Sequence, residues 1–330
     1  MSFSNSSLNT FASCMKKYDL IYNEHKQPDK PNIHLQFGTM AHECLYNAGR
    51  LRDDAADGVV DEGEFYKVIP SEVLYMDLKA AFHIYSWNDY FMAAIKQIYE
   101  YEHSIVEQYK KYGDVTIKRE LKLQVTPEQM NNTTVHNIRE PFVGVIDLLV
   151  MAGDHAIILD YKFSSSRKTQ DDFDLNSQLY MYAYLVHVNY KIPYYNIEVG
   201  YIDIPKQSFE IPVVLSNGKL SRSKSQNCSQ ELYKMAVEVV HENDPYYNCE
   251  PGGYYYEAWC SFANNKSAYL SRQFLDINIA PQVLEDLVDT AETITKMNEH
   301  HMPYLRKYDS YSCKSCEYLK HCKPYLTEVW

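Results

Sequence analysis

The feature that most constrains the fold is a pair of apolar segments in the middle of the chain, separated by two turn residues. Residues 143–162 read Val-Gly-Val-Ile-Asp-Leu-Leu-Val-Met-Ala-Gly-Asp-His-Ala-Ile-Ile-Leu-Asp-Tyr-Lys. Gly153-Asp154 is typical of the two-residue loops that join antiparallel strands. The segment therefore predicts a β-hairpin in which the residues flanking this loop pair with each other and Asp147 lies opposite Asp160.

The opposed aspartates of this hairpin predict a metal site. Directly opposed residues on antiparallel strands lie within about 5.5 Å at their Cα atoms, where like charges repel. A divalent cation compensates this repulsion best, because buried carboxylates without a partner are costly. The strand period of two also places Lys162 on the face of Asp160, so we expect Asp147, Asp160 and Lys162 together. If the turn slips by one residue, Asp147 instead forms a salt bridge with Lys162 at the strand end.

The length and composition allow one large domain or two ordinary ones. The chain has 330 residues, of which 45% are hydrophobic, so it can bury a substantial core. The first thirty residues contain lysines and acids but no apolar core segment, and no run of about eighteen apolar residues occurs. We therefore expect a globular, soluble protein of the cytoplasm, with no membrane partner.

The net charge restricts how the chain can bind nucleic acid. A charge of −12 argues against a general polyanion-binding surface, because nonspecific affinity comes from lysines and arginines that neutralise phosphates. The 31 tyrosines can stack on bases, although packing in cores and interfaces is their commoner use. Any contact with nucleic acid is therefore expected to be local.

The cysteines predict a metal centre that joins the two ends of the chain. Without a secretory signal, the even number of eight does not indicate disulfides. Cys313, Cys316 and Cys322 supply three thiolates at short spacing, and Cys14 is the best candidate for a fourth. Four thiolates suit tetrahedral zinc or a cubane iron–sulfur cluster, and the spacing does not separate the two. The other cysteines, at positions 44, 228, 249 and 260, are expected to be buried small hydrophobes.

Two helices are expected to bring further polar side chains to the hairpin. Residues 38–51 have helical periodicity, and His42 can project from them into the site, although a helix histidine is more often a packed or surface group. Residues 174–190 form the strongest helix of their region, with the first residue, an aspartate, as candidate N-cap. Gln178 and Tyr182 lie one turn apart on it, so both can face the strands. Their alternative role is helix packing with one polar contact.

A further acidic residue lies on a predicted strand just before the hairpin. Residues 115–125 alternate as a strand, which places Glu120 on the same side as Lys118 and Lys122. A solvated cross-strand charge is the favoured interpretation of Glu120. It is kept as a weak site candidate.

Taken in order along the chain, these features resemble the PD-(D/E)XK nuclease superfamily. Within it they are most similar to the RecB-like exonucleases and to the CRISPR-associated iron–sulfur exonucleases of the Cas-four type. Any single feature is common, but the ordered set is specific. The set comprises residues 4–18 with Cys14, Phe37-Gly38-Thr39-Met40-Ala41-His42-Glu43, Gly144-Val145-Ile146-Asp147, Asp160-Tyr161-Lys162, Gln178-Leu179-Tyr180-Met181-Tyr182 and the three late cysteines.

The resemblance implies an enzyme, a metal-dependent deoxyribonuclease that hydrolyses phosphodiester bonds as an exonuclease in recombination, repair or the processing of DNA ends. DNA, single-stranded or as duplex ends, would be its substrate, and a helicase or recombinase its partner. It also implies particular roles for the residues. His42, Asp147 and Asp160 would bind Mg²⁺ or Mn²⁺, Lys162 would be the catalytic lysine, Gln178 and Tyr182 would support this lysine and the substrate strand, and Cys14, Cys313, Cys316 and Cys322 would hold a 4Fe–4S cluster, with Zn²⁺ as the alternative.

Two positions depart from the pattern of the family. Met15 stands where such proteins often have proline after the first cysteine, which alters only the start of a helix. Asp160 occupies a position more often filled by glutamate, which shortens the reach to a metal. About half of the chain, chiefly residues 51–110 and 206–300, carries no matching motif.

The expected architecture is α/β, a restriction-endonuclease-like core with a mixed central sheet flanked by helices, plus a cysteine-ligated iron–sulfur module that joins the two termini. Two other functions remain open: a DNA-binding or assembly subunit with a weak or inactive site, and an endonuclease of the same fold. The expected divisions are 1–50, an N-terminal helical segment with the first cluster cysteine and the histidine motif; 51–110, a helical region; 111–205, the nuclease core; 206–300, a helical insertion; and 301–330, the iron–sulfur segment.

Overall fold

The computed structural model describes nine stretches of the chain. Most of the expected helical region 51–110 lies outside them, because residues 55–86 are not described. The described stretches are 2–30, 32–54, 87–131, 138–164, 168–174, 176–206, 212–226, 228–307 and 309–322.

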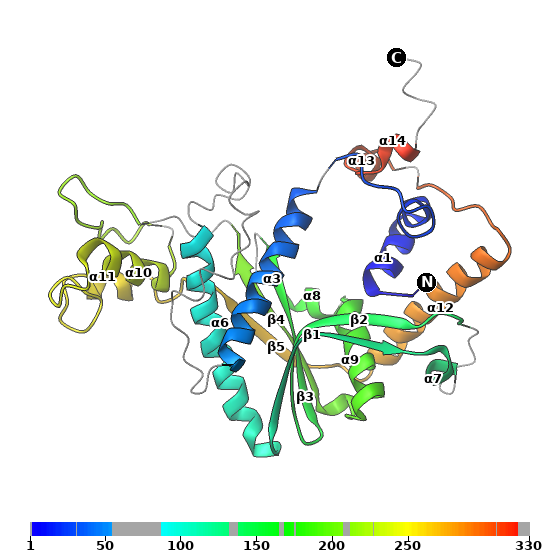
Figure 1. Ribbon diagram of the computed structural model, residues 1–330, viewed down its shortest axis with the longest axis horizontal. Coiled ribbons are helices and arrows are strands. Elements are labelled where there is room, and N and C mark those ends of the chain that lie inside the picture. The colour runs from blue at the N-terminus through cyan, green and yellow to red at the C-terminus, as the bar shows by residue number, and fades with distance from the viewer. Residues whose placement is uncertain are drawn as a thin grey trace, which may run out of the picture.

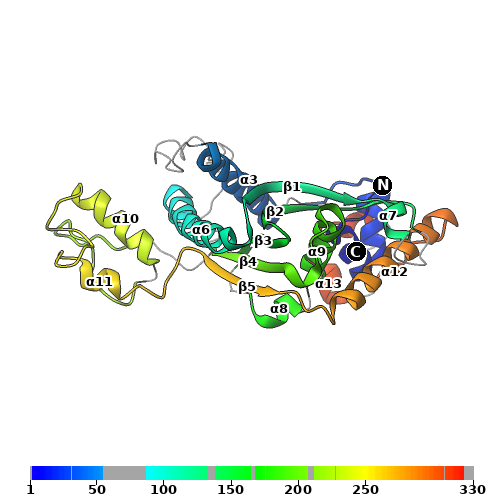
Figure 2. The same ribbon diagram turned by 90° about the horizontal axis from the view of Figure 1, so that it is seen from below.

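A five-stranded mixed sheet forms the centre of the molecule, with the strands in the order β1-β2-β3-β4-β5 (Figure 2). Adjacent strands pair antiparallel except β3 and β4, which are parallel. The expectation of an α/β fold with a mixed sheet flanked by helices is therefore confirmed. The strands are β1 Val115–Val125, β2 Phe142–Ala152, β3 His155–Ser164, β4 Ile197–Pro205 and β5 Tyr269–Phe274.

Helices cover both faces of this sheet (Figure 1). α3 and α6 pack on one face, and α9, α12 and α1 pack on the other. The helices are α1 Asn5–Ser13, α2 Met15–Tyr18, the π-helical turn η1 Asp19–Asn23, α3 Ile33–Asp54, α6 Trp87–Tyr109, the 3₁₀ turn η4 Lys110–Tyr112, α7 Pro127–Asn131, α8 Gln170–Asp174, α9 Ser177–Tyr190, the 3₁₀ turn η5 Tyr194–Asn196, α10 Gln230–His241, α11 Tyr256–Cys260, α12 Ala280–Glu299, α13 Ser310–Lys314 and α14 Leu319–Cys322.

Strand alternation divides the core between the two faces. On β2, Leu148 and Val150 pack with α3 and α6, whereas Leu149 and Met151 pack with α9 and α12. A strand whose successive side chains are apolar on both faces must be covered on both. This requirement explains the three-layer arrangement of helices, sheet and helices.

The hairpin has the register that its turn residues predict. Ala152 pairs with His155 across the Gly153-Asp154 loop, and the ladder continues outward to Leu148 opposite Leu159. The slipped alternative is therefore excluded. One local prediction is wrong: α9 begins three residues later than expected, and its N-cap is Asn176, whose side chain accepts from the backbone of Gln178 at 2.8 Å.

The stretch 206–300 contains a strand as well as helices. β5 pairs with β4 at the edge of the main sheet. α10 and α11 have a small core of their own, formed with Tyr233, Tyr255 and Phe262. α12 instead belongs to the main core, because Ala291 and Ile294 pack there beside α9.

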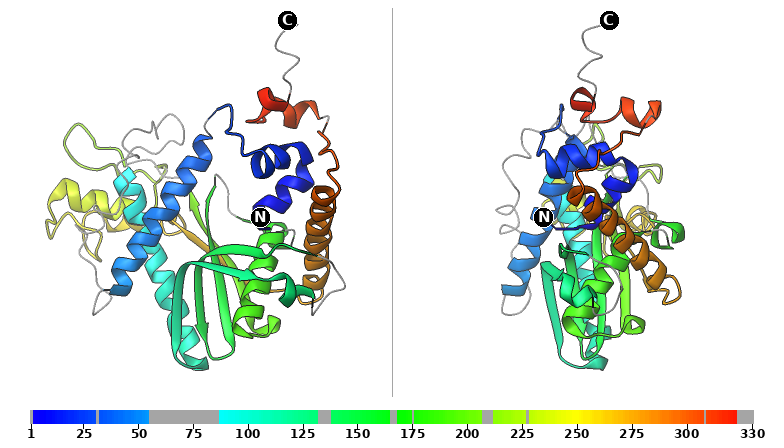
Figure 3. Two further views of the ribbon diagram at one scale, coloured as in Figure 1. Left: turned by 45° about the vertical axis from the view of Figure 1, so that its right-hand side comes forward. Right: turned by 90° about the vertical axis from the view of Figure 1, so that its right-hand side faces the viewer.

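Residues 15–30 lie beside α13 and α14, so segments near the two ends of the chain contact each other (Figure 3). Lys17 forms an ion pair with Glu317 at 3.0 Å, and the Asn32 amide donates to the same carboxylate at 2.7 Å. Asp29 adds two contacts, through its own backbone N–H to Glu317 and through its side chain to the backbone of Lys320. Of the helices described, none is long and apolar enough to span a bilayer.

Candidate metal site

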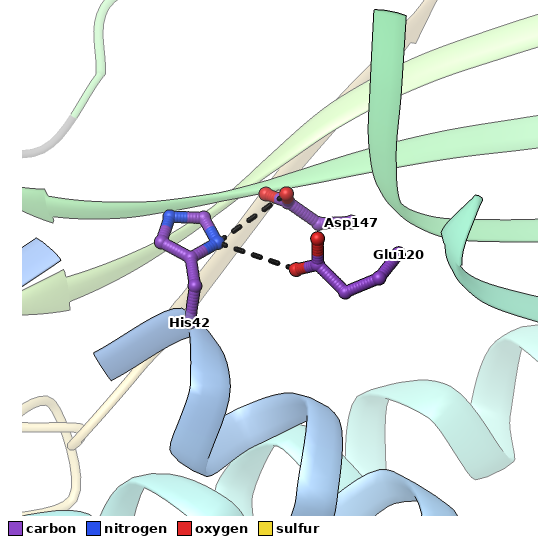
Figure 4. Close-up of side chains that lie close together, drawn as sticks. All are labelled: His42, Glu120 and Asp147. Carbon is purple, nitrogen blue, oxygen red and sulfur yellow. Dashed lines mark ion pairs between the residues drawn. The ribbon is translucent and has the colours of Figure 1, made fainter. Parts of the chain in front are cut away.

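Three ligand-type side chains converge at the end of the hairpin next to α3. The Nδ1 atom of His42 lies 3.3 Å from Asp147 Oδ1 and 3.8 Å from Glu120 Oε1 (Figure 4). One potential ligand atom from each residue falls within 4.8 Å of the others. Carboxylates are the donors that Mg²⁺ and Mn²⁺ prefer in proteins, and imidazole is a common ligand of other divalent transition metals. The group can therefore hold a single divalent ion.

Each of these side chains comes from a different element that packing holds in place. α3 presses Phe37, Ala41 and Cys44 into the core, which leaves His42 at the edge of the sheet. Asp147 is buried on β2, where its Oδ2 accepts the backbone N–H of Tyr161 at 2.7 Å. This hydrogen bond spans the hairpin just beyond the last residue pair of the ladder. The carboxylate of Asp147 is thus oriented by the neighbouring strand.

Glu120 reaches the cluster because the backbone of β1 changes conformation at this residue. Its φ of 45° lies in the left-handed region, which residues other than glycine seldom adopt. Before it, Val115 and Ile117 pack on the α3 and α6 side; after it, Leu123 and Val125 pack on the α9 side. The strand therefore exchanges faces at Glu120, and side chains at this point can approach α3.

β2 exchanges faces at the same level. Leu148 and Val150 pack with α3 and α6, whereas Ile146 packs with α9. On β1 and β2, Arg119 pairs with Leu148 and Leu121 pairs with Ile146, so Glu120 lies opposite Asp147. Glu120, Asp147 and Asp160 consequently lie at one level on three adjacent strands.

The sequence pattern gave Glu120 less weight than its position warrants. Strict alternation placed it with Lys118 and Lys122 as a solvated charge. In the structure, the burial pattern of β1 loses its alternation at residues 119–121. The opposition of Glu120 to Asp147 was the available signal, but it requires the pairing of β1 with β2, which the sequence alone did not provide.

Asp160 lies beside this cluster and forms an ion pair with Lys162. The Lys162 ammonium is 2.5 Å from Asp160 Oδ2, and both side chains are on the face that α9 covers. Burial and the nearby charge of Asp147 raise the pKa of Asp160, against the lowering effect of Lys162, to about 6 overall. Asp160 therefore depends on a neighbouring cation to stay ionised.

Gln178 connects the ion pair to α9. Its side-chain oxygen accepts from Lys162 at 3.2 Å, and its amide donates to Asp160 at 3.1 Å and to the Tyr182 hydroxyl at 2.8 Å. α9 can approach β2 this closely because residue 144 is glycine: a Cβ there would lie 2.9 Å from the Tyr182 ring. The structure thus brings Gln178 and Tyr182 to Asp160 and Lys162.

The charges of the site leave a deficit that one divalent ion balances. Three carboxylates face one lysine when His42 is neutral, which gives a net charge of about −2. Burial lowers the pKa of His42, but its bonds to Asp147 and Glu120 outweigh burial and raise it to about 10. In the absence of a metal, a proton on His42 therefore supplies part of the missing positive charge.

The four cysteines expected to form a centre lie in one neighbourhood at the joined ends. Cys14 separates α1 from α2, Cys313 lies in α13, and Cys322 ends α14. Burial raises the pKa of Cys322 against the lowering effect of Arg306, and the nearby thiols of Cys14, Cys313 and Cys316 also raise it. All four are free thiols. Of the other cysteines, those at 44, 228 and 249 are buried as expected, whereas Cys260 is exposed.

Comparison with known proteins relates this chain to a nuclease family. A model of the PD-(D/E)XK nuclease superfamily matches residues 2–323. The chain is also similar to a crystal structure of a "putative exonuclease" from Eubacterium rectale, with 12% identity, a TM-score of 0.44, and coverage of 97% of this chain and 87% of that chain. The crystal structure of SSO0001 shares 10% identity and a TM-score of 0.25, with coverage of 84% and 82%. None of the curated proteins matches.

Proposed function

Because this chain belongs to the PD-(D/E)XK nuclease superfamily, we propose that it is a metal-dependent exonuclease that hydrolyses phosphodiester bonds of DNA at its ends. The observation that carries the proposal is the convergence of His42, Glu120 and Asp147 beside the pair Asp160 and Lys162. A role in recombination, repair or end processing, with a helicase or recombinase as partner, is part of the same proposal.

The residues of the cluster fit a divalent ion. His42, Glu120 and Asp147 would hold it, with Asp160 beside them as a further ligand. When bound, Mg²⁺ or Mn²⁺ would polarise the scissile phosphate and lower the pKa of a water molecule. His42 must lose its added proton to bind the ion. In the protonated ring both nitrogens carry a hydrogen, so neither has a lone pair for a metal.

Lys162 supplies the positive charge that the chain itself contributes to the reaction. Its ammonium contacts Asp160 and Gln178, which keep it beside the carboxylates where the ion and the phosphate would bind. A fixed cation there offsets the negative charge that develops on the phosphate in the transition state. Gln178 orients both members of the pair, and Tyr182 limits the rotation of Gln178 by accepting its second N–H.

The proposal includes a 4Fe–4S cluster held by Cys14, Cys313, Cys316 and Cys322. Its support is that the thiols of Cys14, Cys313 and Cys316 lie near enough to Cys322 to raise its pKa, and thiolates are the ligands of such clusters. Zn²⁺ is the alternative occupant, since the same donors suit it. Protein purified without oxygen should be brown, and Cys316→Ala should bleach it. A colourless, zinc-loaded preparation would identify zinc instead.

Digestion of end-labelled linear DNA tests the enzymatic proposal. Asp160→Ala should reduce the rate by about a thousandfold or more, because an ion of this kind contributes several kcal/mol at about 1.4 kcal/mol per factor of ten. Asp154→Ala, an exposed change in the turn of the same hairpin, should cleave like the wild type. EDTA should stop cleavage by the wild type and by Asp154→Ala.

Three results would contradict the proposal in different ways. Cleavage of linear DNA by Asp160→Ala at the wild-type rate would exclude this site as the catalytic one. Rapid cleavage of a covalently closed circle would exclude an exonuclease and favour an endonuclease of the same fold. A wild-type protein that binds DNA but leaves it intact with Mn²⁺ would favour the binding or assembly role.

A further inference from the structure

A buried carboxylate outside the metal site receives hydrogen bonds from four donor groups. Glu102 on α6 is 2% exposed, and both of its oxygens are occupied by the Arg119 guanidinium, at 2.9 Å from Nη1 and 2.7 Å from Nη2. Arg52 adds a contact at 3.1 Å and the Tyr161 hydroxyl one at 3.2 Å. Such a two-pronged pair of arginine and carboxylate fixes orientation as well as distance.

The partners of Glu102 belong to the segments that carry the site. Arg119 directly precedes Glu120 on β1. Tyr161 lies between Asp160 and Lys162 on β3, and its backbone N–H is the group that donates to Asp147. Glu102 therefore contacts Arg119, which precedes Glu120, and Tyr161, which follows Asp160. Through the backbone of Tyr161 it is also connected to Asp147.

α3 is held by the same network. Arg52 and Asp53 lie in its last turn, and the Asp53 carboxylate accepts from Nε and Nη2 of Arg119 at 2.8 and 3.1 Å. The Arg119 guanidinium thus bonds to Asp53 along one edge and to Glu102 along another, and it is almost fully buried. His42 lies on the same helix, so the position of α3 against β1 also determines where its imidazole lies.

A glycine leaves the space that Arg119 occupies. A Cβ at Gly49 would lie 2.6 Å from Arg119 Nε and 2.7 Å from both Cδ and Cζ of the same side chain. No side chain other than hydrogen fits at this position of α3 while the arginine reaches Glu102. The close approach shows that helix and guanidinium are packed as one unit.

Stability alone is a poor reason for burying these charges. Taking an ion pair out of water costs free energy that its attraction often only offsets, and apolar residues of similar size can replace such pairs without loss. The network is complete, and its partners coincide with the neighbours of the site residues.

We propose that Glu102 and Arg119 are positioning residues, which hold Glu120, Asp147 and His42 in the relative geometry that the divalent ion needs. This inference rests on the proposed metal-dependent function. It predicts that loss of the network lowers metal affinity even where the fold survives. Groups that orient metal ligands in this way typically change affinity by about 10- to 100-fold when they are replaced.

Calorimetric titration of the full-length protein with Mn²⁺ tests the inference. Glu102→Gln keeps the shape of the side chain but removes its charge, and it should weaken Mn²⁺ binding at least about tenfold. Arg119→Lys keeps the charge but loses the two-pronged contact, and should behave similarly. If either variant does not fold, Tyr161→Phe removes only one hydroxyl and leaves the backbone bond to Asp147; it should weaken binding about twofold to threefold.

The chain offers a matched control in Glu198 on β4. This glutamate also accepts from a tyrosine hydroxyl, that of Tyr109 at 3.0 Å, and lies 3.6 Å from an arginine, Arg272. Glu198→Gln should lower the thermal stability but leave Mn²⁺ affinity unchanged. Tyr109→Phe is the corresponding control for Tyr161→Phe.

The outcomes separate the inference from the function on which it rests. Wild-type protein that binds Mn²⁺, with binding lost in Asp147→Asn, establishes the metal site. If Glu102→Gln then binds Mn²⁺ as tightly as Glu198→Gln does, the positioning role is overturned and the nuclease proposal stands. If wild-type protein does not bind Mn²⁺, both are overturned.

Discussion

The carboxylate cluster and the cysteine group were both expected from spacing along the chain, yet the fold builds them differently. Glu120, Asp147 and Asp160 lie on three adjacent strands of one sheet, and His42 on a helix of 22 residues. The cysteines lie on or beside helices of four to nine residues at the two ends of the chain. The carboxylate cluster is part of the core, whereas the cysteines lie in the terminal segments outside it.

This difference indicates what each site needs in order to form. Ladder hydrogen bonds and the buried Glu102 network hold the carboxylates before any ion arrives. Short helices have little stability of their own, so we expect the cysteine group to depend on the proposed metal centre and on a few contacts such as Lys17 with Glu317. We therefore expect the first site to lose function but not structure when its ligand is removed, and the second to lose structure.

Cys316→Ala should produce the largest change in stability. A centre that ligates Cys14 and the late cysteines closes a loop of about 300 residues, and its loss costs up to about 5 kcal/mol of the free energy of unfolding in a loop-closure estimate. Chemical denaturation measures this loss, and limited proteolysis should cut the released ends first. Cys260→Ala, an exposed change, is the control. Equal stability of both variants would show that the ends are held without a centre.

The metal-free protein should become less stable as the pH rises from about 5 to 9. The raised pKa of Asp160, about 6, favours the fold at low pH, and this contribution is lost as the pH passes 6. The raised pKa of His42, about 10, stabilises the fold fully below about 6.5 and progressively less up to 10. Thermal unfolding in EDTA should show the decline, and Mn²⁺ should remove it. A flat profile in EDTA would contradict this picture of the empty cluster.

Tyr182→Phe should have a moderate effect on cleavage and little on the fold. The change removes the acceptor for Gln178 while the ring continues to fill the space beside Gly144. The loss of one such hydrogen bond, about 1 kcal/mol, corresponds to a rate about fivefold lower. Tyr190→Phe on the same helix, where the side chain is exposed, is the control. Identical single-turnover rates for the two variants would exclude a role for this contact.

The smallest expected effect separates strain from function at Glu120. Asparagine adopts the left-handed conformation more readily, so Glu120→Asn should have a free energy of unfolding up to about 1 kcal/mol higher than that of Glu120→Gln. Both variants lose the carboxylate and should weaken Mn²⁺ binding alike. Equal stability of the two variants would show that the conformation of β1 is not strained here.

The features that the sequence by itself determined are local ones. The two-residue loop after Ala152 and the apolar segments on either side set the register of the hairpin, because a turn of fixed length and a side-chain period of two leave no other pairing that buries both faces. The same reasoning identified β1 with its observed bounds and placed Gln178 and Tyr182 on one side of α9.

What only the tertiary structure decided is how separate segments meet. The site role of Glu120 depends on one left-handed residue, which exchanges the faces of β1, and on the pairing of β1 with β2. The contact of Glu102 with Arg119 joins α6 to β1. The arginine side chain can lie against α3 on the way because residue 49 is glycine. Periodicity describes one segment at a time, whereas these contacts arise from the packing of several, so they were decided when the helices closed on the sheet.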